Sequence, residues 1–282
     1  MRCWGTRGSI PSPGPRTARY GGNTTCFEVR TGGHRIVFDA GSGIRPLGRD
    51  LLSDQGAMDT PIFLTHFHWD HIQGFPFFLP LYTPGKDLQI IGPKQKNIDV
   101  RSLFAGQMGP IYFPVPFSAL SANLTFGHLN EGSWEGKGVT LHTMRVKHPS
   151  YVIGYRIEAA ERVICFIPDN ELDGEGYEVR NGWRDALVEF VSGADLLIHD
   201  SMYTDEEYPA HRGWGHSTFR QSLQLAEEAG ARRLLFFHHD PERTDDALDE
   251  IVNRVRDEAL ARGSTVDMDA AREGTDFTIE EK

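Results

Sequence analysis

The sequence predicts an α/β protein in which sheets are covered by helices on their outer faces. Short apolar runs rich in β-branched and aromatic residues recur along the chain, and turn signals bound most of them. Segments with helical spacing alternate with these runs. With 282 residues, of which 39% are hydrophobic and 24% charged, the chain can bury a sizeable core. Since several runs have the pattern of strands buried on one or both faces, outer helices should cover the sheets.

The expected strands are the apolar runs themselves, taken in chain order. Their β-branched and aromatic content favours an extended backbone, and the flanking turn residues set their approximate limits. We expect strands at residues 26–30, 34–41, 61–68, 88–93, 139–148, 151–159, 162–169, 194–200, 232–239 and 276–281.

The expected helices are three segments with apolar residues at amphipathic spacing, namely 183–194, 217–231 and 244–263. In the second segment, Thr218 and Gln221 match the Thr-x-x-Gln pattern of a capping box, so a helix should begin there. No repeat, low-complexity tract or linker divides the chain. We therefore expect one domain over residues 1–282.

Residues 75–117 are less regular than the rest of the chain. Two stretches in this segment are dense in proline and aromatic residues and resist both helix and central strand. Such a segment is a packed surface loop, a pocket wall or a subunit interface. The sequence leaves these alternatives open.

Composition and charge disfavour several classes of protein. The chain has 29 basic and 40 acidic residues, a net charge of −11, and no basic stripe of the kind that binds a long nucleic acid. No apolar run approaches the roughly 20 residues of a membrane span. Three widely spaced cysteines, Cys3, Cys26 and Cys165, favour a reduced, cytoplasmic setting. A small anionic substrate remains compatible with this charge.

The stretch THFHWDHIQG, residues 65–74, concentrates side chains that bind metal ions. If the preceding apolar run continues in extended form, His66 and His68 face the same side, and Asp70 and His71 follow at the turn. Two imidazoles with an adjacent carboxylate–imidazole pair suit two metal ions that share one pocket. The alternative is a set of ordinary polar residues at a strand end, with Asp70 capping the next helix. The spacing favours a metal site.

This motif lies after FDAGSG and before a glycine, and it resembles the metallo-β-lactamase superfamily of metallohydrolases from GTRGSIP through His238. The resemblance implies the metallo-β-lactamase fold, a four-layer αββα sandwich with a dinuclear site at the edge of its two sheets. It also implies ligands at later strand ends, which match His148, Asp169 and His238. By that matching, one ion would be held by His66, His68 and His148, the other by Asp70, His71 and His238, and Asp169 would bridge them together with a hydroxide.

Some assignments around this set have alternatives. Either His238 or His239 could be the last ligand, and the superfamily pattern favours His238. Asp169 stands where sulfur-ligated relatives have a cysteine, and Cys165 is expected in the core. Asp39 either orients the motif loop through hydrogen bonds or caps the turn at GSG. Of the other histidines, His211 either lines the pocket or lies in a surface loop, and the expected surface or strand positions are His34, His128 and His142.

The stretch GWGHSTF places His216 and Ser217 at the predicted helix start, where backbone N–H groups and the helix dipole favour an anion. A histidine there can donate to a phosphoryl oxygen or to a leaving group. His-Ser-Thr before a final ligand resembles the ribonuclease Z and phosphodiesterase branch of the superfamily. LLIHDSMY resembles the His-Glu-Ala-Thr segment of that branch, which implies that Asp200, in the glutamate's place, partners His216.

These features predict a metal-dependent phosphodiesterase, that is, a hydrolase of ester bonds. The expected substrate is a small phosphodiester, and a cyclic nucleotide-type phosphodiester is preferred. The expected catalytic residues are Asp70, Asp200 and His216. A ribonuclease Z-like RNA endonuclease is the alternative, but residues 170–215 leave little room for the glycine- and proline-rich arm that grips transfer RNA. A non-catalytic metal-binding regulator is disfavoured because every ligand position is filled. Zinc is expected, with manganese or iron as alternatives, and a homodimer is an open expectation.

Overall fold

The structure, a computed structural model that describes residues 1–54, 59–95 and 98–279, contains two β-sheets in the orders β1-β2-β3-β4-β5-β6 and β13-β12-β11-β10-β9-β8-β7. The strands of the first sheet are β1 (Arg2–Gly5), β2 (Cys26–Thr31), β3 (His34–Phe38), β4 (Asp59–Phe63), β5 (Asp87–Gly92) and β6 (Asn123–His128). Those of the second are β7 (Gly132–Gly136), β8 (Val139–Val146), β9 (Val152–Ala159), β10 (Arg162–Ile167), β11 (Leu196–Asp200), β12 (Arg233–Phe237) and β13 (Asp267–Ala270). The helices are α1 (Ile44–Ser53), α2 (Trp69–Ile72), α3 (Val100–Gln107), α4 (Trp183–Val191), α5 (Phe219–Glu228) and α6 (Asp245–Ala261), with short 3₁₀ turns η1 (Phe75–Phe77), η2 (Leu79–Tyr82), η3 (Phe117–Ala119) and η4 (Tyr208–Ala210).

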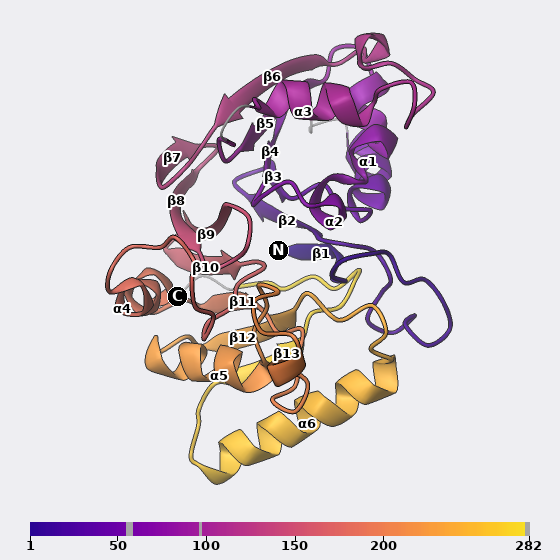
Figure 1. Ribbon diagram of the computed structural model, residues 1–282. Coiled ribbons are helices and arrows are strands. Elements are labelled where there is room, and N and C mark those ends of the chain that lie inside the picture. The colour runs from indigo at the N-terminus through magenta and orange to yellow at the C-terminus, as the bar shows by residue number, and fades with distance from the viewer. Residues whose placement is uncertain (55–58, 96–97, 280–282) are drawn as a thin grey trace.

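The inner faces of the two sheets meet in one aromatic layer. The ring of Phe27 in β2 lies 4.4 Å from that of Phe166 in β10, and Phe38 in β3 lies 5.2 Å from Tyr155 in β9. On the outer faces, α1 and α3 pack on the first sheet and α4, α5 and α6 on the second (Figure 1). The predicted α/β class and αββα sandwich are therefore confirmed.

Strand direction decides where the connections of the sandwich gather. β3 and β4 are parallel, and so are β10, β11 and β12. β8 runs in the same direction as β10, because both are antiparallel to β9. The carboxyl ends of these strands therefore lie at one edge of their sheets, where sites in such folds are commonly built.

The three predicted helices are confirmed as α4, α5 and α6, each slightly shorter than the periodic segment. The capping box of α5 is present as well. Thr218 Oγ1 accepts a hydrogen bond from Gln221 N (3.2 Å), and Gln221 Oε1 accepts one from Thr218 N (2.9 Å). These reciprocal bonds satisfy two otherwise unpaired N–H groups at the helix start, as the sequence pattern predicts.

Two predicted strands differ most from the observed ones. The strand expected at 61–68 ends at Phe63. His66 and His68 lie in the irregular backbone that follows, and Asp70 and His71 lie in α2. Of the strand expected at 276–281, residues 276–279 form only an isolated bridge between Asp276 and Arg2, and the remainder lies outside the described residues. The last strand is instead β13, at Asp267–Ala270. Its sequence DMDA lacks a strand-like apolar pattern, and the strand forms by pairing with β12.

Helix α1 was not predicted, because Pro46 and Gly48 interrupt its pattern. Pro46 is tolerated in the first helical turn, where the backbone N–H needs no intrahelical partner. A Cβ at Gly48 would lie 2.8 Å from the Phe78 ring, so the glycine permits close packing of α1 on η2. Also unpredicted were α3 and the strands β1, β6 and β7.

The segment 75–117 divides into a packed and an exposed part. Phe75 and Phe78 are fully buried beneath α1, and the Phe75 ring stacks on Phe104 of α3 at 3.9 Å. Farther along, Ile111 and Tyr112 are 89% and 72% exposed. The packed-loop alternative therefore holds for the first part, and the second part remains open to solvent.

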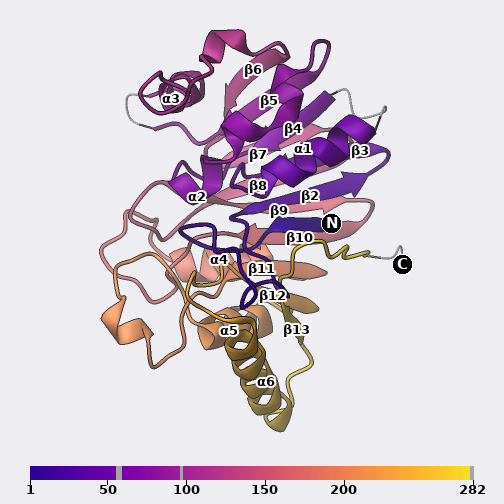
Figure 2. The ribbon, with the colours of Figure 1, turned by 90° about the vertical axis from the view of Figure 1, so that its right-hand side faces the viewer.

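The two ends of the described chain lie close together (Figure 2). The amino group of Met1 donates to Phe277 O (2.9 Å), and β1 runs beside β2 at the border of the first sheet. Among the helices of the described residues, none combines the length and the apolar character that crossing a bilayer requires.

Candidate metal centre

The connections at the carboxyl edge of the sandwich bring the predicted ligands together. The motif follows β4, His148 follows β8, Asp169 follows β10 and His238 follows β12. Their side chains form two groups, in each of which one ligand atom per residue lies within 4.8 Å of the others. The groups are His66, His68, His148 and Asp169, and Asp70, His71, Asp169 and His238.

The first group consists of three imidazoles and one carboxylate oxygen. His66 Nε2 lies 3.5 Å from Asp169 Oδ2, and His148 Nε2 lies 3.3 Å from His68 Nδ1. His66, His148 and Asp169 are buried, whereas His68 is exposed at the mouth of the centre. This group matches the three histidines that the sequence assigns to one ion.

The second group meets the other oxygen of the shared aspartate. Asp169 Oδ1 lies 3.1 Å from His71 Nε2 and 3.2 Å from His238 Nε2. Asp70 Oδ2 lies 3.1 Å from the same His238 nitrogen. Because Asp169 turns one oxygen toward each group, its carboxylate has the orientation that a bridge between two cations requires.

The residues fit divalent metal ions. Within the described part of the chain, His66 Nε2, His71 Nε2 and Asp169 Oδ1 are buried side-chain atoms that make no hydrogen bond. Leaving such atoms unpaired in a protein interior is costly, so a ligand for them is expected. Imidazole nitrogens and carboxylate oxygens converging from separate strands form the donor set of zinc and related cations.

The two neighbouring histidines after β12 face in different directions. His238 Nε2 points at Asp70 and Asp169, whereas His239 Nε2 lies 2.8 Å from the carbonyl oxygen of Ala271. His238 takes a left-handed backbone conformation (φ 61°), which turns its side chain into the centre. A Cβ at Gly8 would lie 2.4 Å from the His238 ring, so the loop GTRGS packs directly over it. Of the two alternatives, the geometry favours His238.

Asp39 supports the motif rather than capping the following turn. Asp39 Oδ2 lies 2.8 Å from His71 Nδ1 and accepts from Thr65 Oγ1 (2.9 Å), while Oδ1 accepts from Thr65 N (2.8 Å). Bonding at Nδ1 leaves Nε2 of His71 to face Asp169. The prediction that Asp39 orients the motif loop is confirmed at the level of these contacts.

Sequence inspection missed Glu171, a fully buried carboxylate two residues after Asp169. Its oxygens accept hydrogen bonds from Gly213 N (2.9 Å), Gly215 N (3.0 Å) and the hydroxyl of Tyr208 (2.8 Å). Glu171 thereby holds the loop before His216 against the connection that carries Asp169. Apart from the nearby hydroxyl of Tyr177, its partners are 37 to 44 positions away in the sequence, so no local pattern marks this residue.

Gly215 was also missed, and it orients His148. The carbonyl oxygen of Gly215 lies 3.1 Å from His148 Nδ1, so the opposite nitrogen, Nε2, is left to face the metal centre. Gly215 has φ +94°, and a Cβ there would lie 2.0 Å from His148 Nδ1. Only glycine allows both this backbone conformation and this contact.

We expect Gly215→Ala to displace His148 and to lower metal affinity or activity by about 10- to 100-fold, the usual cost of disturbing a residue that orients a ligand. Gly213→Ala is the matched control, because Gly213 also has a positive φ (+82°) but no atom within 4 Å of an added Cβ. Titration of the metal-free variants with zinc measures the difference. Equal losses in the two variants would show that backbone strain, and not the contact with His148, is responsible.

The charges of the centre favour bound cations. Burial would raise the pKa of Asp169, but His238 and His71 outweigh this and hold it well below its ordinary value. Burial would lower the pKa of His71, but the carboxylates of Asp169 and Asp70 raise it well above the usual range. Burial lowers the pKa of His148 to about 4. Asp169 is thus ionised and His148 neutral, as metal binding needs, whereas His71 would release its proton when a cation binds.

His216 and Asp200 form a hydrogen-bonded pair beside the second group. His216 Nδ1 lies 2.8 Å from Asp200 Oδ2, which also accepts from Asn170 N (3.0 Å). The His216 ring stacks on that of His238, with centroids 4.8 Å apart. Burial lowers the pKa of His216, but Asp200 outweighs it and raises the pKa to about 9. The predicted contact is present, and the catalytic role of the pair stays a prediction.

Other residues singled out in the sequence lie away from the two groups. Cys165 is buried in the core beneath α4, as predicted. His34 and His128 are exposed, and His142 lies in β8 with its Nε2 3.9 Å from Glu158. His211 lies in the loop before His216, where its ring stacks on Tyr203 at 4.3 Å.

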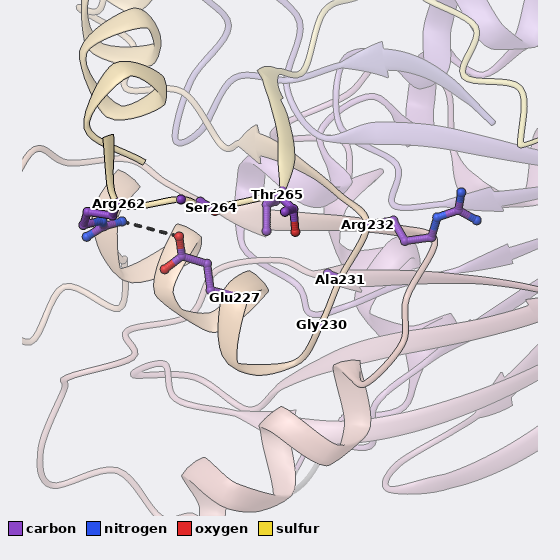
Figure 3. A pocket seen from close by; sticks show the side chains of 9 residues that line it. Glu227, Gly230, Ala231, Arg232, Arg262, Ser264 and Thr265 are labelled. Atoms are coloured by element: carbon purple, nitrogen blue, oxygen red, sulfur yellow. Dashed lines mark hydrogen bonds and ion pairs between the residues drawn. The ribbon is translucent and has the colours of Figure 1, made fainter. Parts of the chain in front are cut away.

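A surface hollow of about 820 Å³ lies at the opposite, amino-terminal edge of the second sheet, between the turns that follow α5 and α6 (Figure 3). Glu227 and Arg262 form an ion pair of 3.4 Å across it, and Arg232 and Thr265 line its wall. Its lining contains no histidine or cysteine. This hollow is therefore separate from the metal centre.

Several known proteins are similar to this chain in sequence or fold. A family model described as beta-lactamase superfamily domain matches residues 34–239. A ribonuclease Z of Thermoplasma acidophilum is 28% identical over 283 aligned positions, which cover 86% of each protein. Human tRNase Z, short form, has a TM-score of 0.66 at 22% identity over 99% of this chain and 98% of its own. A diphosphatase from the PhnP family has a TM-score of 0.64 at 17% identity over 99% and 97%.

An αββα sandwich with two His/Asp groups around a shared aspartate defines a metallohydrolase of the metallo-β-lactamase fold. The chain belongs to the beta-lactamase superfamily, since the model of that superfamily's domain matches most of its length. The predicted superfamily, its branch with ribonuclease Z, and the class of metal-dependent hydrolase are thus confirmed. The extent of one domain over residues 1–282 stays a prediction.

Proposed function

We propose that this protein hydrolyses a small phosphodiester, most of all a cyclic nucleotide-type phosphodiester. The observation that carries the proposal is the His216–Asp200 pair beside the second His/Asp group, with His216 Nδ1 held by Asp200. A histidine oriented in this way, next to a cationic centre, suits the departure of an alkoxide from phosphorus.

Seven residues would hold two divalent metal ions, with zinc preferred and manganese or iron as alternatives. His66, His68 and His148 would serve one ion, Asp70, His71 and His238 the other, and Asp169 both. When bound, such ions supply charge neutralisation at the phosphoryl oxygens and water of lowered pKa. Asp70 is kept in place by a hydrogen bond from Ser9 N to its Oδ2 (2.8 Å).

His216 has the role of general acid in this proposal. Its Nδ1 is engaged by Asp200, so Nε2 is the nitrogen that would donate a proton to the leaving oxygen. Asp200 is fully buried and is itself fixed by hydrogen bonds from Asn170 N and Met202 N. The carboxylate thereby holds the imidazole in one orientation and stabilises its charged form.

A small substrate is favoured by what lies between Asp169 and His216. Residues 170–215, all of which the structure describes, form α4, β11 and η4 with their connections, and their packing is continuous with the second sheet. A net charge of −11 also opposes binding of a long polyanion. These features support a compact anion rather than an RNA.

An RNA endonuclease is the second candidate, and the similarity to a ribonuclease Z over 86% of the chain favours it. A non-catalytic metal-binding regulator is the third, and the complete set of candidate ligands speaks against it. A cytoplasmic location and a homodimer also remain proposals. The location is supported by three free, buried cysteines.

The candidates are separated by measuring hydrolysis of cyclic nucleotides, dinucleotides and precursor transfer RNA at matched concentration and salt. We expect at least one cyclic nucleotide to be hydrolysed faster than the RNA, with activity lost on chelation and restored by zinc or manganese. Faster cleavage of precursor transfer RNA would favour the second candidate. Metal binding without hydrolysis of any of the three would favour the regulator.

A further inference from the structure

A row of aromatic rings leads from the surface to His216. The indole of Trp214 lies 4.9 Å from the ring of His211, His211 stacks on Tyr203 at 4.3 Å, and Tyr203 lies 6.0 Å from His216. Trp214 is 60% exposed, whereas Tyr203 is buried. The row therefore offers an aromatic surface to solvent at one end and reaches the proposed general acid at the other.

The loop that carries this row is anchored at several points. His211 Nδ1 donates to the carbonyl oxygen of Glu207 (2.8 Å), and Glu207 is paired with Arg243 at 2.6 Å. Glu171 binds the N–H groups of Gly213 and Gly215, on either side of Trp214. An exposed tryptophan so restrained loses little freedom when a second ring packs on it, which favours binding.

The position of the row indicates which part of a substrate it would meet. In the proposed reaction, a hydroxide oxygen forms a bond to phosphorus, the bond from phosphorus to the leaving oxygen breaks, and His216 transfers a proton to that oxygen. The leaving group would therefore lie beside His216, whose ring neighbours Tyr203 at the inner end of the row. A planar group attached to it would reach these rings.

We propose that Trp214 and His211 form a stacking platform for a nucleobase carried by the leaving group. This inference rests on the proposed function and names its substrate class, a nucleoside phosphodiester whose departing oxygen belongs to the nucleoside. Stacking of a base on an aromatic side chain typically strengthens binding by about 5- to 100-fold and tolerates different bases. The platform thus selects nucleotides over phosphodiesters of aliphatic alcohols.

The test compares binding of three compounds to the zinc-loaded full chain by calorimetric titration: adenosine 5′-monophosphate, ribose 5-phosphate and inorganic phosphate. We expect the nucleotide to bind at least about 5-fold more tightly than ribose 5-phosphate. Trp214→Ala should abolish this advantage and leave the affinities for ribose 5-phosphate and phosphate unchanged. Trp214→Phe should restore most of it, because the phenyl ring also stacks.

Tyr112→Ala is the matched control, since Tyr112 is 72% exposed but lies outside the ring row. It should keep the preference for the nucleotide. A preference that is absent from the wild-type protein, or that survives in Trp214→Ala, would overturn the platform while leaving the phosphodiesterase proposal intact. A loss shared equally by all three compounds would mean that Trp214 only supports the loop, and would overturn it as well.

Discussion

Asp169→Ala is expected to remove most of the bound divalent metal and to lower hydrolysis by more than about 100-fold, beyond the usual 10- to 100-fold cost of changing a residue that only orients a ligand. Wild-type protein purified from metal-replete medium should carry about two ions per chain. The physical reason is that the two carboxylate oxygens of Asp169 face different groups. Its Oδ2 lies 3.5 Å from His66 Nε2, and its Oδ1 lies 3.1 Å from His71 Nε2. Its removal takes one ligand from each group and leaves the buried histidines with less compensating negative charge.

Elemental analysis of the protein and hydrolysis of a small phosphodiester measure this result. Asp173→Ala is the control, because it removes the same charge from the same connection, where Asp173 is exposed and accepts a hydrogen bond from Gln221 (2.7 Å). It should keep both metal and activity. The dinuclear assignment would be wrong if wild-type protein were fully active with one ion or none. It would also be wrong if Asp169→Ala kept two ions.

His216→Ala is expected to slow hydrolysis of a nucleoside phosphodiester by about 10²- to 10⁴-fold, the range that general acid catalysis contributes. Bis(4-nitrophenyl) phosphate should lose much less, because nitrophenolate departs without a proton. Metal content should stay unchanged, since His216 is proposed as a proton donor and not as a ligand. Steady-state rates on the two substrates, with metal analysis of the same preparations, measure the contrast.

The pH profile gives an independent signature of the same residue. Because the pKa of His216 is raised to about 9 by Asp200, the imidazole is protonated below this value and loses its proton above it. Bound cations repel that proton and lower the pKa. The rate of hydrolysis of the nucleoside substrate should therefore decrease with rising pH, along a descending limb centred at or below about pH 9. The nitrophenyl ester should lack this limb. Asp200→Asn should move it to lower pH, since the neutral amide no longer stabilises the imidazolium.

Three outcomes would contradict this role. Equal losses on both substrates, with metal intact, would mean that His216 only binds the phosphoryl group. Loss of metal from His216→Ala would make it a ligand, consistent with its position within 4.8 Å of His238 and Asp200 ligand atoms, and the assignment of His238 would need revision. An unchanged limb in Asp200→Asn would assign the titration to another group.

Much of the centre was readable in the chain because its signals are local. His66, His68, Asp70 and His71 lie within six residues of one another after an apolar strand, and the capping box of α5 spans only four. Side-chain spacing along an extended or helical backbone is set by local geometry, so such patterns survive without knowledge of the fold. The resemblance to a known superfamily supplied the distant ligands.

The limits of elements were less readable, because neighbours can override local preference. The strand expected through His68 ends at Phe63. Leu64 N still bonds to Ile91 O of β5 (2.7 Å), but the side chains of His66 and His68 then join the candidate metal centre. The sequence of β13 has little strand preference, and the strand forms because its backbone pairs with the edge of β12. In α1, Pro46 is tolerated in the first turn, and burial of the apolar face against η1 and η2 outweighs the cost of Gly48.

Local sequence was thus enough to predict the class of fold, a metal site and the candidate ligands His66, His68, Asp70 and His71. Tertiary packing was needed for the choice of His238 over His239, for the bonds of Asp39 to Thr65 and His71, and for the roles of Glu171 and Gly215. These depend on where connections far apart in the chain meet at the carboxyl edge of the sheets. Their partners are chosen by strand order and direction, which no short stretch of residues encodes.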